Sequence, residues 1–270
     1  MTQAPAPRSR LWQLRRVAAE QLLWVRLAVQ RAGARLTGST RPLPTPVPSC
    51  DVLSTLAQSE RAVRECRRLG LAPHKDMPKN WDALGAVSTI LHDLGTDVRV
   101  LDAGAAWYSP VLPWLRLYGV RNLVGINVEF RRVVRHGTVR YEPGDITATR
   151  YDAGSFDAIT CMSVIEHGVS LDKFAAESAR LLRPGGVLVV STDYDQQPAD
   201  TTGKTAYGTP VRIFGPADIR AFVDTAAGFG LTLLGELVLG HDERPVHWKR
   251  MGLNYTFIRL TFSRTASSVP

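Results

Sequence analysis

The sequence has little cysteine and no long apolar run. Its three cysteines, Cys50, Cys66 and Cys161, share none of the short spacings of metal or redox motifs, which favours reduced thiols in a reducing compartment. The best apolar stretch, Leu22–Val25, is far shorter than the ~20 residues that a membrane-spanning helix needs. Arginines interrupt the N-terminal region where a signal peptide would carry its apolar core. These absences predict a cytoplasmic protein.

Acidic residues are nearly absent from the first 50 positions. These positions hold eight arginines, no lysine and one acid, Glu20, so they carry +7 of the formal net charge of +8. The remaining residues are close to neutral, which argues against a core that binds nucleic acid. Hydrophobic residues make up 44% of the 270 positions, which is enough for a sizeable core and excludes wholesale disorder.

Residues 1–49 are predicted to form a basic amphipathic helix and a proline-rich linker. Apolar residues recur at intervals of three and four within 11–36, as on one face of an α-helix, and alternating prolines in 42–48 favour an extended chain. Three interpretations stay open. The helix packs on its own domain or on a second subunit, it lies on an anionic membrane surface, or it is an organellar transit peptide.

Residues 50–270 are predicted to form one α/β domain. Short apolar runs with strand character alternate with helical stretches, which is typical of a mostly parallel sheet covered by helices on both faces. We expect strands at 98–102, 122–127, 138–142, 156–162, 187–192, 231–239 and 255–262, and helices at 54–69, 80–94, 110–118, 171–182 and 216–228. The last two strands lack a helical connection, so an antiparallel finish is expected.

Ligands of such sheets bind at the carboxyl ends of the strands, and several suitable residues follow the predicted strands. Gly104 permits a tight turn after the first strand. Asn127 ends the second strand with an amide that can bind hydroxyl groups. Gly144-Asp145-Ile146 follows the third strand and suits an adenine ring, and the fourth leads into Cys161-Met-Ser-Val-Ile-Glu-His167.

The motifs at these positions resemble those of class I S-adenosylmethionine-dependent methyltransferases, in that family's order, over roughly residues 80–262. The resemblance rests on Val100-Leu-Asp-Ala-Gly104, Gly144-Asp145-Ile146, Gly154-Ser-Phe-Asp-Ala158, Ser163-Val-Ile-Glu-His167 and Leu181-Leu-Arg-Pro-Gly-Gly186. It implies a Rossmann-like, seven-stranded, mostly parallel sheet that binds S-adenosylmethionine. Lys79-Asn-Trp-Asp82, Thr192-Asp-Tyr194 and Val246-His-Trp-Lys-Arg250 also resemble a bacterial subgroup seen among polysaccharide and secondary-metabolite genes.

Carried over position by position, the resemblance assigns the cofactor site. Asp102, Gly104 and Ala105 would form the turn under the methionine part, and Asn127 would bind the ribose. Asp145 and Ile146 would contact the adenine, with Met162 and Ser163 near the methyl-bearing sulfur. Ala106 replaces the family's usual second glycine, and Asn127 replaces its usual acid. These departures leave open a degenerate cofactor loop. The segment 128–138 is also short for a full crossover helix.

A hydroxyl acceptor loses its proton as the methyl bond forms, which requires a base or a metal ion. His167 is the favoured base because an imidazole titrates near neutral pH, with Asp193 and His247 as reserves. Ubiquinone-pathway O-methyltransferases are similar in this segment and bind a divalent cation there, but Ser163 stands at the first carboxylate of that pattern, so a metal stays uncertain. Other substrate contacts are expected from Glu166, Tyr207, Arg212 and Phe214.

The sequence therefore predicts O-methylation of a small molecule, a sugar or another secondary metabolite, with no nucleic-acid partner. Two alternatives stay open. One is a methyltransferase-like fold that binds a ligand or partner without methyl transfer. The other retains the cofactor but methylates nitrogen or carbon, or catalyses a non-methylating reaction.

Overall fold

The computed structural model describes Val25, Val29 and residues 41–206 and 208–265 of the chain. The helices are α2 (Leu56–Arg68), α3 (Lys79–Asp93), α4 (Val111–Leu117), α5 (Leu171–Leu181), α6 (Pro216–Gly228) and the short 3-10 helix η1 (Lys249–Met251). The strands are β1 (Asp51–Val52), β2 (Arg99–Ala103), β3 (Asn122–Asn127), β4 (Val134–His136), β5 (Val139–Pro143), β6 (Phe156–Met162), β7 (Leu182–Tyr194), β8 (Thr205–Ala206), β9 (Thr209–Pro210), β10 (Leu231–Leu233), β11 (Val246–Trp248) and β12 (Leu253–Arg264).

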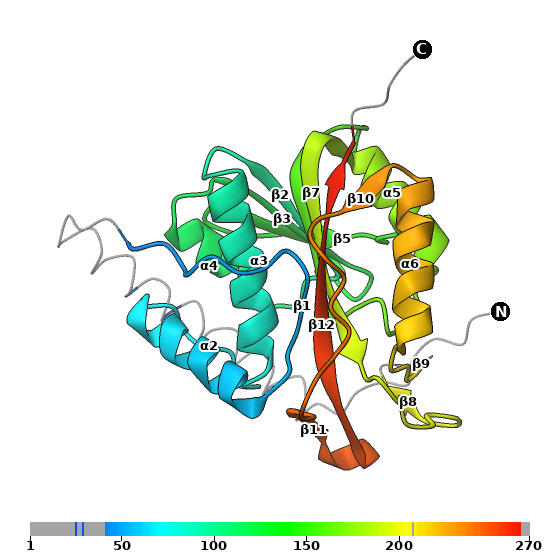
Figure 1. Cartoon of the computed structure of the whole chain (residues 1–270). Helices are drawn as coiled ribbons and strands as arrows, with labels where there is room; N and C mark the ends of the chain where they lie inside the picture. Colours follow the sequence, from blue (N-terminus) through cyan, green and yellow to red (C-terminus); the bar gives the residue numbers. More distant parts are fainter. Residues whose placement is uncertain (1–24, 26–28, 30–40, 207, 266–270) are drawn as a thin grey trace.

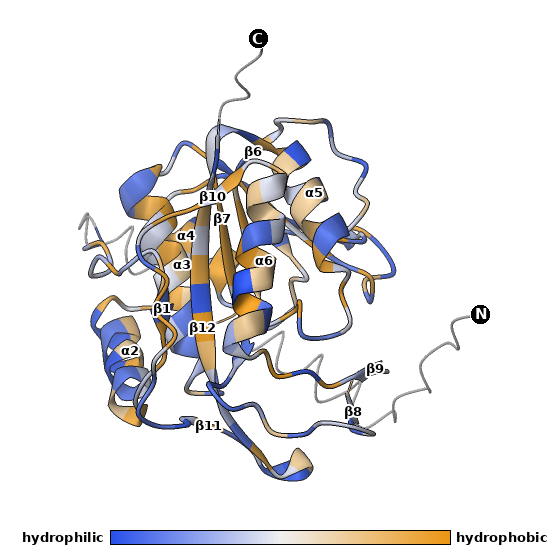
Figure 2. Ribbon diagram, turned by 45° about the vertical axis from the view of Figure 1, so that its right-hand side comes forward, coloured by the Kyte–Doolittle hydropathy of each residue, from blue (hydrophilic) through white to orange (hydrophobic). Residues whose placement is uncertain are grey.

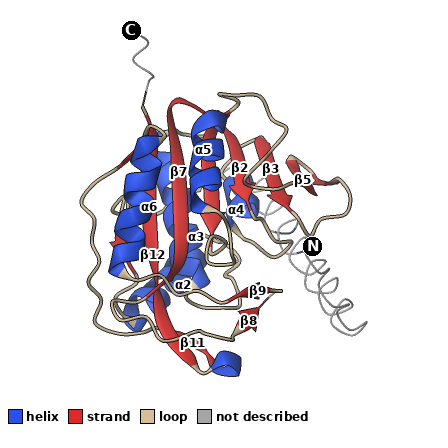
Figure 3. Ribbon diagram, turned by 90° about the vertical axis from the view of Figure 1, so that its right-hand side faces the viewer, coloured by secondary structure: helices blue, strands red, loops and turns tan. Residues whose placement is uncertain are grey.

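The main sheet has the strand order β1-β12-β7-β6-β2-β3-β5-β4. Strands β7, β6, β2, β3 and β5 run parallel to one another. β12 is antiparallel to β7, and β1, β10 and β11 pair with β12 in antiparallel fashion. The predicted mostly parallel α/β sheet with an antiparallel finish is therefore confirmed. Its parallel strands place their carboxyl ends along one edge, the lower edge in Figure 3.

Helices cover both faces of the sheet (Figure 1). α2, α3 and α4 contribute to one buried apolar cluster, and α5 and α6 contribute to a second cluster on the other face. Figure 2 shows the corresponding pattern, in which the central strands are largely hydrophobic and the helices alternate between hydrophobic and hydrophilic faces. Amphipathic helices packed on a sheet that is apolar on both sides produce this layered arrangement.

Two predicted elements differ from the structure. The strand expected at 231–239 ends at Leu233, because Gly235 at φ 76° turns the chain away and the following residues form a loop. β7 is longer than the expected 187–192, running from Leu182 to Tyr194. As expected, 128–138 has no crossover helix, and instead β4 forms an antiparallel hairpin with β5.

The proline-rich linker lies against the domain from residue 41 onward. Ser88 Oγ donates to Thr45 O at 2.9 Å, and His92 Nε2 lies 2.9 Å from Pro44 O. The guanidinium of Arg259 donates to Pro48 O at 3.0 Å. The domain thus binds carbonyl groups of the linker, and the boundary at 49/50 stays a prediction. The helix expected at 11–36 falls outside the described residues except for Val25 and Val29, which are helical and exposed.

Arg259 is buried between β12 and α3, with 1% of its surface exposed. Its guanidinium lies 4.7 Å from the ring centroid of Trp81 and directly over Gly85. A Cβ atom at Gly85 would lie 2.1 Å from Arg259 Nη1, so α3 approaches β12 this closely only because residue 85 has no side chain. None of the described helices is long and apolar enough to cross a membrane.

Candidate functional site

The loop after β2 makes a tight turn at the carboxyl edge of the sheet. Gly104 has φ 86°, a left-handed conformation that favours glycine, and its N–H donates to Ile126 O at 2.9 Å. A Cβ atom at this position would lie 2.5 Å from a methyl group of Val164. Ala105 is buried beneath the loop, and the Ala106 N–H donates to Ser109 Oγ at 3.0 Å. The turn predicted at Gly104 is thus present, with Ala106 accommodated in it.

Asn127 ties this loop to the end of β3. Its side-chain nitrogen donates to Gly104 O at 3.3 Å and to Ala105 O at 2.9 Å. Its side-chain oxygen accepts the Glu129 N–H at 2.8 Å. Both donors of the amide are therefore used within the chain, and a second lone pair of the oxygen is left for a ligand hydroxyl. An acid at this position would lack the two donors that hold the loop.

Asp102 lies beneath the loop with 3% of its surface exposed. Burial raises the pKa of this carboxyl to about 7, although the hydrogen bond from Thr160 Oγ1 at 2.8 Å lowers it in part. Thr160 belongs to β6, so Asp102 links two neighbouring strands under the turn. The carboxyl therefore supports the loop from below.

The turn after β5 carries the residues expected at the adenine ring. Asp145 is exposed, and one of its oxygens accepts the N–H of Thr147 at 2.8 Å and its hydroxyl at 2.7 Å. Ile146 is almost completely buried in the apolar cluster of α5 and α6. A cavity of about 150 Å³ lies beside this turn and is lined by Glu142, Gly144 and Tyr151 among others. It is smaller than the ~300 Å³ and more of typical ligand pockets.

Ser163 is a strained residue at the end of β6. Among the residues that the structure describes, Ser163 is the one residue other than glycine with a positive φ, at 53°. Its N–H donates to Ser191 O at 2.9 Å, and its hydroxyl oxygen is buried without a hydrogen-bond partner among the described residues. Strained backbone and unsatisfied buried polar atoms concentrate at ligand sites. Next to it, the Met162 sulfur lies 3.7 Å from Ser191 Oγ.

A cluster of three buried carboxyls and the partly exposed Lys79 lies at the carboxyl ends of β6 and β7. It consists of Lys79 and Asp82 from the first turn of α3, Glu166 from the turn after β6, and Asp193 from β7. Ser191 Oγ donates to Asp82 at 2.8 Å, and Thr192 Oγ1 donates to Glu166 at 3.0 Å. Lys79 Nζ lies 4.2 Å from the ring centroid of Phe257, the cross-strand neighbour of Asp193. We call these four residues the acid–lysine cluster.

Burial shifts the protonation of this cluster. It raises the pKa of Glu166 to about 7, against the opposing attraction of Lys79. Burial also raises the pKa of Asp193 well above its usual range, and the charge of Glu166 adds to this effect. Although burial lowers the pKa of Lys79, attraction to Asp82, Asp193 and Glu166 leaves it above its ordinary value. At neutral pH the cluster therefore combines one firm cation with carboxyls that can take up or release a proton.

His167 and Tyr255 border the acid–lysine cluster. The Tyr255 hydroxyl is hydrogen-bonded to Asp193. Burial lowers the pKa of His167, with Asp193 acting in the opposite direction, so the imidazole is largely neutral at pH 7 and able to accept a proton. The structure thus brings together three residues that the sequence predicted, Glu166, His167 and Asp193.

Sequence reasoning missed Lys79, Asp82 and Tyr255 as site residues. A signal for Asp82 was present: α3 is buried on nearly all sides from Asn80 to Leu91, so a carboxyl within this stretch has no solvent-facing side to occupy. No group of three His, Cys, Asp or Glu residues that could hold a metal ion is found within 41–206 and 208–265. The described residues therefore offer no set of side chains for the divalent metal that the sequence left open.

The remaining predicted residues lie elsewhere. His247 is exposed on β11, where its Nδ1 lies 2.8 Å from Asn254 Oδ1. Arg212 is paired with Asp218 at 2.9 Å and lies over the ring of Phe214. Phe214 is fully buried in the apolar cluster of α5 and α6, so its ring packs in the core and does not face the acid–lysine cluster. Tyr207 falls outside the described residues. The proposed roles of these four residues stay predictions.

The long connection after β7 lies next to the turn that carries His167. Its hairpin β8–β9 brings the side chain of Thr209 to within 3.7 Å of where a Cβ at Gly168 would lie, next to His167. Ala206, Val211 and Ile213 of this segment are buried in the apolar cluster that contains Tyr255 and Phe257. The position of the hairpin beyond the end of β7 is visible in Figure 3.

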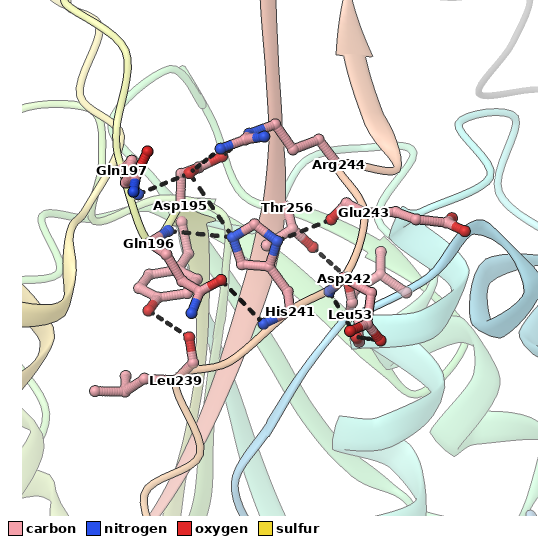
Figure 4. A network of polar contacts seen from close by, with 12 residues as sticks. Leu53, Asp195, Gln196, Gln197, Leu239, His241, Asp242, Glu243, Arg244 and Thr256 are labelled. Carbon is pink, nitrogen blue, oxygen red and sulfur yellow. Dashed lines mark hydrogen bonds and ion pairs between the residues drawn. The ribbon is translucent and has the colours of Figure 1, made fainter.

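A polar network fixes the loop 234–245 to the end of β7 (Figure 4). Asp195 accepts two hydrogen bonds from Arg244, at 2.5 and 2.9 Å. His241 Nε2 accepts the Gln196 N–H at 3.1 Å, and its Nδ1 lies 2.9 Å from Glu243 O, so both ring nitrogens contact the backbone. Tyr194 Oη donates to Leu239 O at 2.7 Å. The network holds the carboxyl end of β7, and with it Asp193, in place.

This fold and site define a doubly wound α/β protein whose parallel strands carry a glycine turn, a strained serine and buried acids at one edge. Residues 101–190 match a family model described as a methyltransferase domain. This third of the chain is therefore similar to the methyltransferase-domain family, and its sheet and helices have the fold of a solved S-adenosylmethionine-dependent methyltransferase.

Individual proteins are more distantly similar. A ubiquinone biosynthesis O-methyltransferase of Xanthomonas oryzae pv. oryzae is 31% identical over 108 residues, which cover 40% of this chain and 38% of that protein. The chain thus matches well under half the length of this curated relative. Among solved structures, the [4+2]-cyclase SpnF has a TM-score of 0.52 at 14% identity, with 92% of this chain and 97% of that chain covered. The 1,6-didemethyltoxoflavin-N1-methyltransferase of Burkholderia thailandensis has a TM-score of 0.50 at 16% identity, with 83% and 94% covered. These structures establish the likeness of fold.

Proposed function

We propose that the chain transfers the methyl group of S-adenosylmethionine to a hydroxyl oxygen of a small molecule. The observation that carries the proposal is the acid–lysine cluster, buried beside the Gly104 turn and the strained Ser163 at the edge where such sheets bind ligands. The match of residues 101–190 to a methyltransferase-domain model supports the cofactor, and the distant ubiquinone biosynthesis O-methyltransferases support oxygen as the acceptor atom.

The residues at this edge fit the cofactor. The turn at Gly104 would hold its methionine part, and the remaining lone pair of Asn127 Oδ1 its ribose. The second Asp145 oxygen, which has no partner among the described residues, would bind its adenine amino group. The buried Ser163 hydroxyl has no partner among the described residues and would gain one from the ligand. When bound, S-adenosylmethionine supplies an electrophilic methyl group. The main task of the chain is then to hold the acceptor in line and to remove its proton.

Two side chains of the site suit proton removal, and a third would stabilise the charge that it creates. His167 is largely neutral at pH 7 and borders Asp193, which would stabilise the imidazolium that forms when the ring accepts a proton. Glu166, with a pKa of about 7, is a second acceptor poised near the operating pH. The ammonium of Lys79 lies beside these carboxyls and would stabilise negative charge that develops on the acceptor oxygen.

The acceptor is proposed to be a sugar or another secondary metabolite. The hairpin β8–β9, which lies next to Gly168, and the segment that follows it would form the wall of its binding site. Structural neighbours include an enzyme solved with the small molecule 1,6-didemethyltoxoflavin. The proposal names a hydroxyl acceptor, because the ammonium of Lys79 would repel a protonated amine and would attract a developing alkoxide.

A second candidate function is ligand binding, or a different reaction, without methyl transfer. It is favoured by the loop after β2, where Ala106 replaces a glycine and both donors of Asn127 are taken by loop carbonyls. The similarity in fold to a [4+2]-cyclase shows that this architecture occurs in a protein named for another reaction.

Two experiments separate the two candidate functions. The first is calorimetric titration with S-adenosylmethionine and S-adenosylhomocysteine, and the second is mass analysis of the products formed from a panel of hydroxylated and glycosylated metabolites. We expect heat on titration and a product heavier by one methyl group in place of a hydrogen. His167→Asn should lower turnover by ~10²-fold or more while cofactor binding is retained. Asp172→Asn, at an exposed position on the start of α5 away from the cluster, is the control and should leave turnover unchanged. Binding without any methylated product would favour the second candidate, and an unchanged rate for His167→Asn would exclude this histidine as the base.

A further inference from the structure

Exposed valines and arginines lie together on the loop and hairpin that follow β3. Val128 is 74% exposed and Val133 is 47% exposed, and both rank among the large apolar residues that the described surface leaves open. Arg131, Arg132 and Arg135 are exposed between and beside them. We call these five residues the basic edge patch.

The three arginines of the patch make no ion pair or hydrogen bond with any other residue of 41–206 and 208–265. Glu129, the acid within this stretch, leaves it with a net positive charge. Arginines on β4 would by themselves discourage edge-to-edge pairing of sheets. That role gives no reason for two valines to be exposed beside them, so edge protection alone does not account for the patch.

The backbone that carries the patch is firmly anchored. Phe130 is buried, and its ring lies 4.4 Å from that of Trp107 in the loop after β2. Its ring also packs at 5.9 Å on Tyr141 of β5. The N–H of Glu129 is bound by Asn127 at 2.8 Å. With Phe130 pointing inward, Val128 and the arginines are presented outward on a fixed loop.

We propose that the basic edge patch is a contact surface for an anionic phospholipid bilayer. Valine side chains that insert between headgroups, flanked by guanidinium groups that bind lipid phosphates, are the combination that peripheral membrane contacts require. Charge complementarity selects this occupant over the chain's own N-terminal segment, because residues 1–50 carry eight arginines and one acid and would be repelled by the patch. It also selects the bilayer over a second copy of the same patch.

The contact would orient the molecule. The patch directly follows Asn127, at the same edge of the sheet as the Gly104 turn, so a bilayer bound there would face the edge that carries the candidate site. The inference does not depend on methyl transfer, because binding is measured without cofactor or acceptor.

Vesicle co-sedimentation of the full-length chain tests the inference, with mixed phosphatidylglycerol and phosphatidylcholine vesicles against phosphatidylcholine alone. We expect binding to the anionic vesicles only, weakened by salt. The double variant Arg131→Gln/Arg132→Gln should reduce the partition coefficient by roughly 25-fold, at about 5-fold for each cation near the surface. The control Lys173→Gln/Arg220→Gln removes two exposed charges from α5 and α6 and should leave binding unchanged.

The variant Val128→Ser/Val133→Ser separates lipid from other anions. It should weaken vesicle binding several-fold and leave the weak electrostatic binding of a short DNA duplex unaffected. Equal vesicle binding by the chain and by both patch variants would overturn the inference and assign any membrane contact to the N-terminal segment. Stronger binding of DNA than of vesicles, lost in the arginine variant alone, would also overturn it.

Discussion

Gly85→Ala is expected to destabilise the protein, although alanine is the better helix former. In the middle of an exposed helix this change would stabilise by ~1 kcal/mol. In α3 the new Cβ would lie 2.1 Å from Nη1, 2.5 Å from Cζ and 2.8 Å from Nε of Arg259, so the guanidinium must move. Arg259 is 1% exposed and has no solvent to move into.

Displacement of Arg259 has a definable cost. It breaks the hydrogen bond to Pro48 O, for which ~1.5–3 kcal/mol is typical of a charged donor, and the contact with the Trp81 ring, for which ~1–2 kcal/mol is typical. After the helix-propensity gain, a net loss of about 2–4 kcal/mol is expected. Urea unfolding followed by circular dichroism measures it. Gly228→Ala, at the end of α6 with no atom within 4 Å of the new Cβ, is the matched control and should be neutral or slightly stabilising.

A double-mutant cycle tests the cause. In an Arg259→Ala background the three clashing atoms are gone, and Gly85→Ala should become neutral or stabilising. If Gly85→Ala costs the same with and without the guanidinium, the close approach of α3 to β12 does not depend on this contact and the reasoning is wrong.

Two further predictions concern the site. Gly104→Ala should destabilise the fold by ~2–4 kcal/mol in urea unfolding, because the new Cβ adds backbone strain at φ 86° and lies 2.5 Å from Val164. The control Gly119→Ala has φ 99° and open space around the new Cβ, so it should show the cost of the strain alone in the same assay. Equal losses for the two variants would refute the contact with Val164. Glu166 has a folded-state pKa of about 7 against an ordinary value of 4.5, so the folded chain binds more protons than the unfolded one, and its contribution to stability should fall by up to ~3 kcal/mol as the pH rises from 4.5 to 7. Urea unfolding across this pH range measures the effect, and the free energy of unfolding should depend less steeply on pH in Glu166→Gln. The control Asp172→Asn, on the exposed start of α5, should leave this pH dependence unchanged. An unchanged slope for Glu166→Gln would show that Glu166 does not titrate in this range.

The strands and helices were predictable because their patterns are local. β3, β6 and α6 have the bounds that the apolar runs and the glycine and proline signals indicate. The strand predicted at 231–239 failed at a non-local feature, since pairing with β12 extends only to Leu233 before Gly235 turns the chain. The apolar pattern of the sequence continues beyond Leu233, but these residues do not pair with β12.

The candidate site was only half predictable for the same reason. Glu166, His167 and Asp193 follow strand ends in sequence, so the topology rule placed them together. Lys79 and Asp82 reach them from α3, about 85 to 115 positions away, and Tyr255 from β12. The strain at Ser163 and the use of the Asn127 donors by loop carbonyls depend on backbone geometry, which residue identity does not reveal.

The acid–lysine cluster is explained better by chemistry than by stability. Burying three carboxyls with one ammonium costs free energy that apolar residues of similar size would avoid. The same desolvation that raises the pKa of Glu166 makes its carboxylate a stronger base than one in water, and proton uptake removes a buried negative charge. Lys79 remains cationic throughout. When a carboxylate takes the proton of a nearby hydroxyl group, the negative charge moves to that oxygen, and the same ammonium can still stabilise it. A cluster of this composition destabilises the resting fold and favours proton transfer from a neutral hydroxyl group.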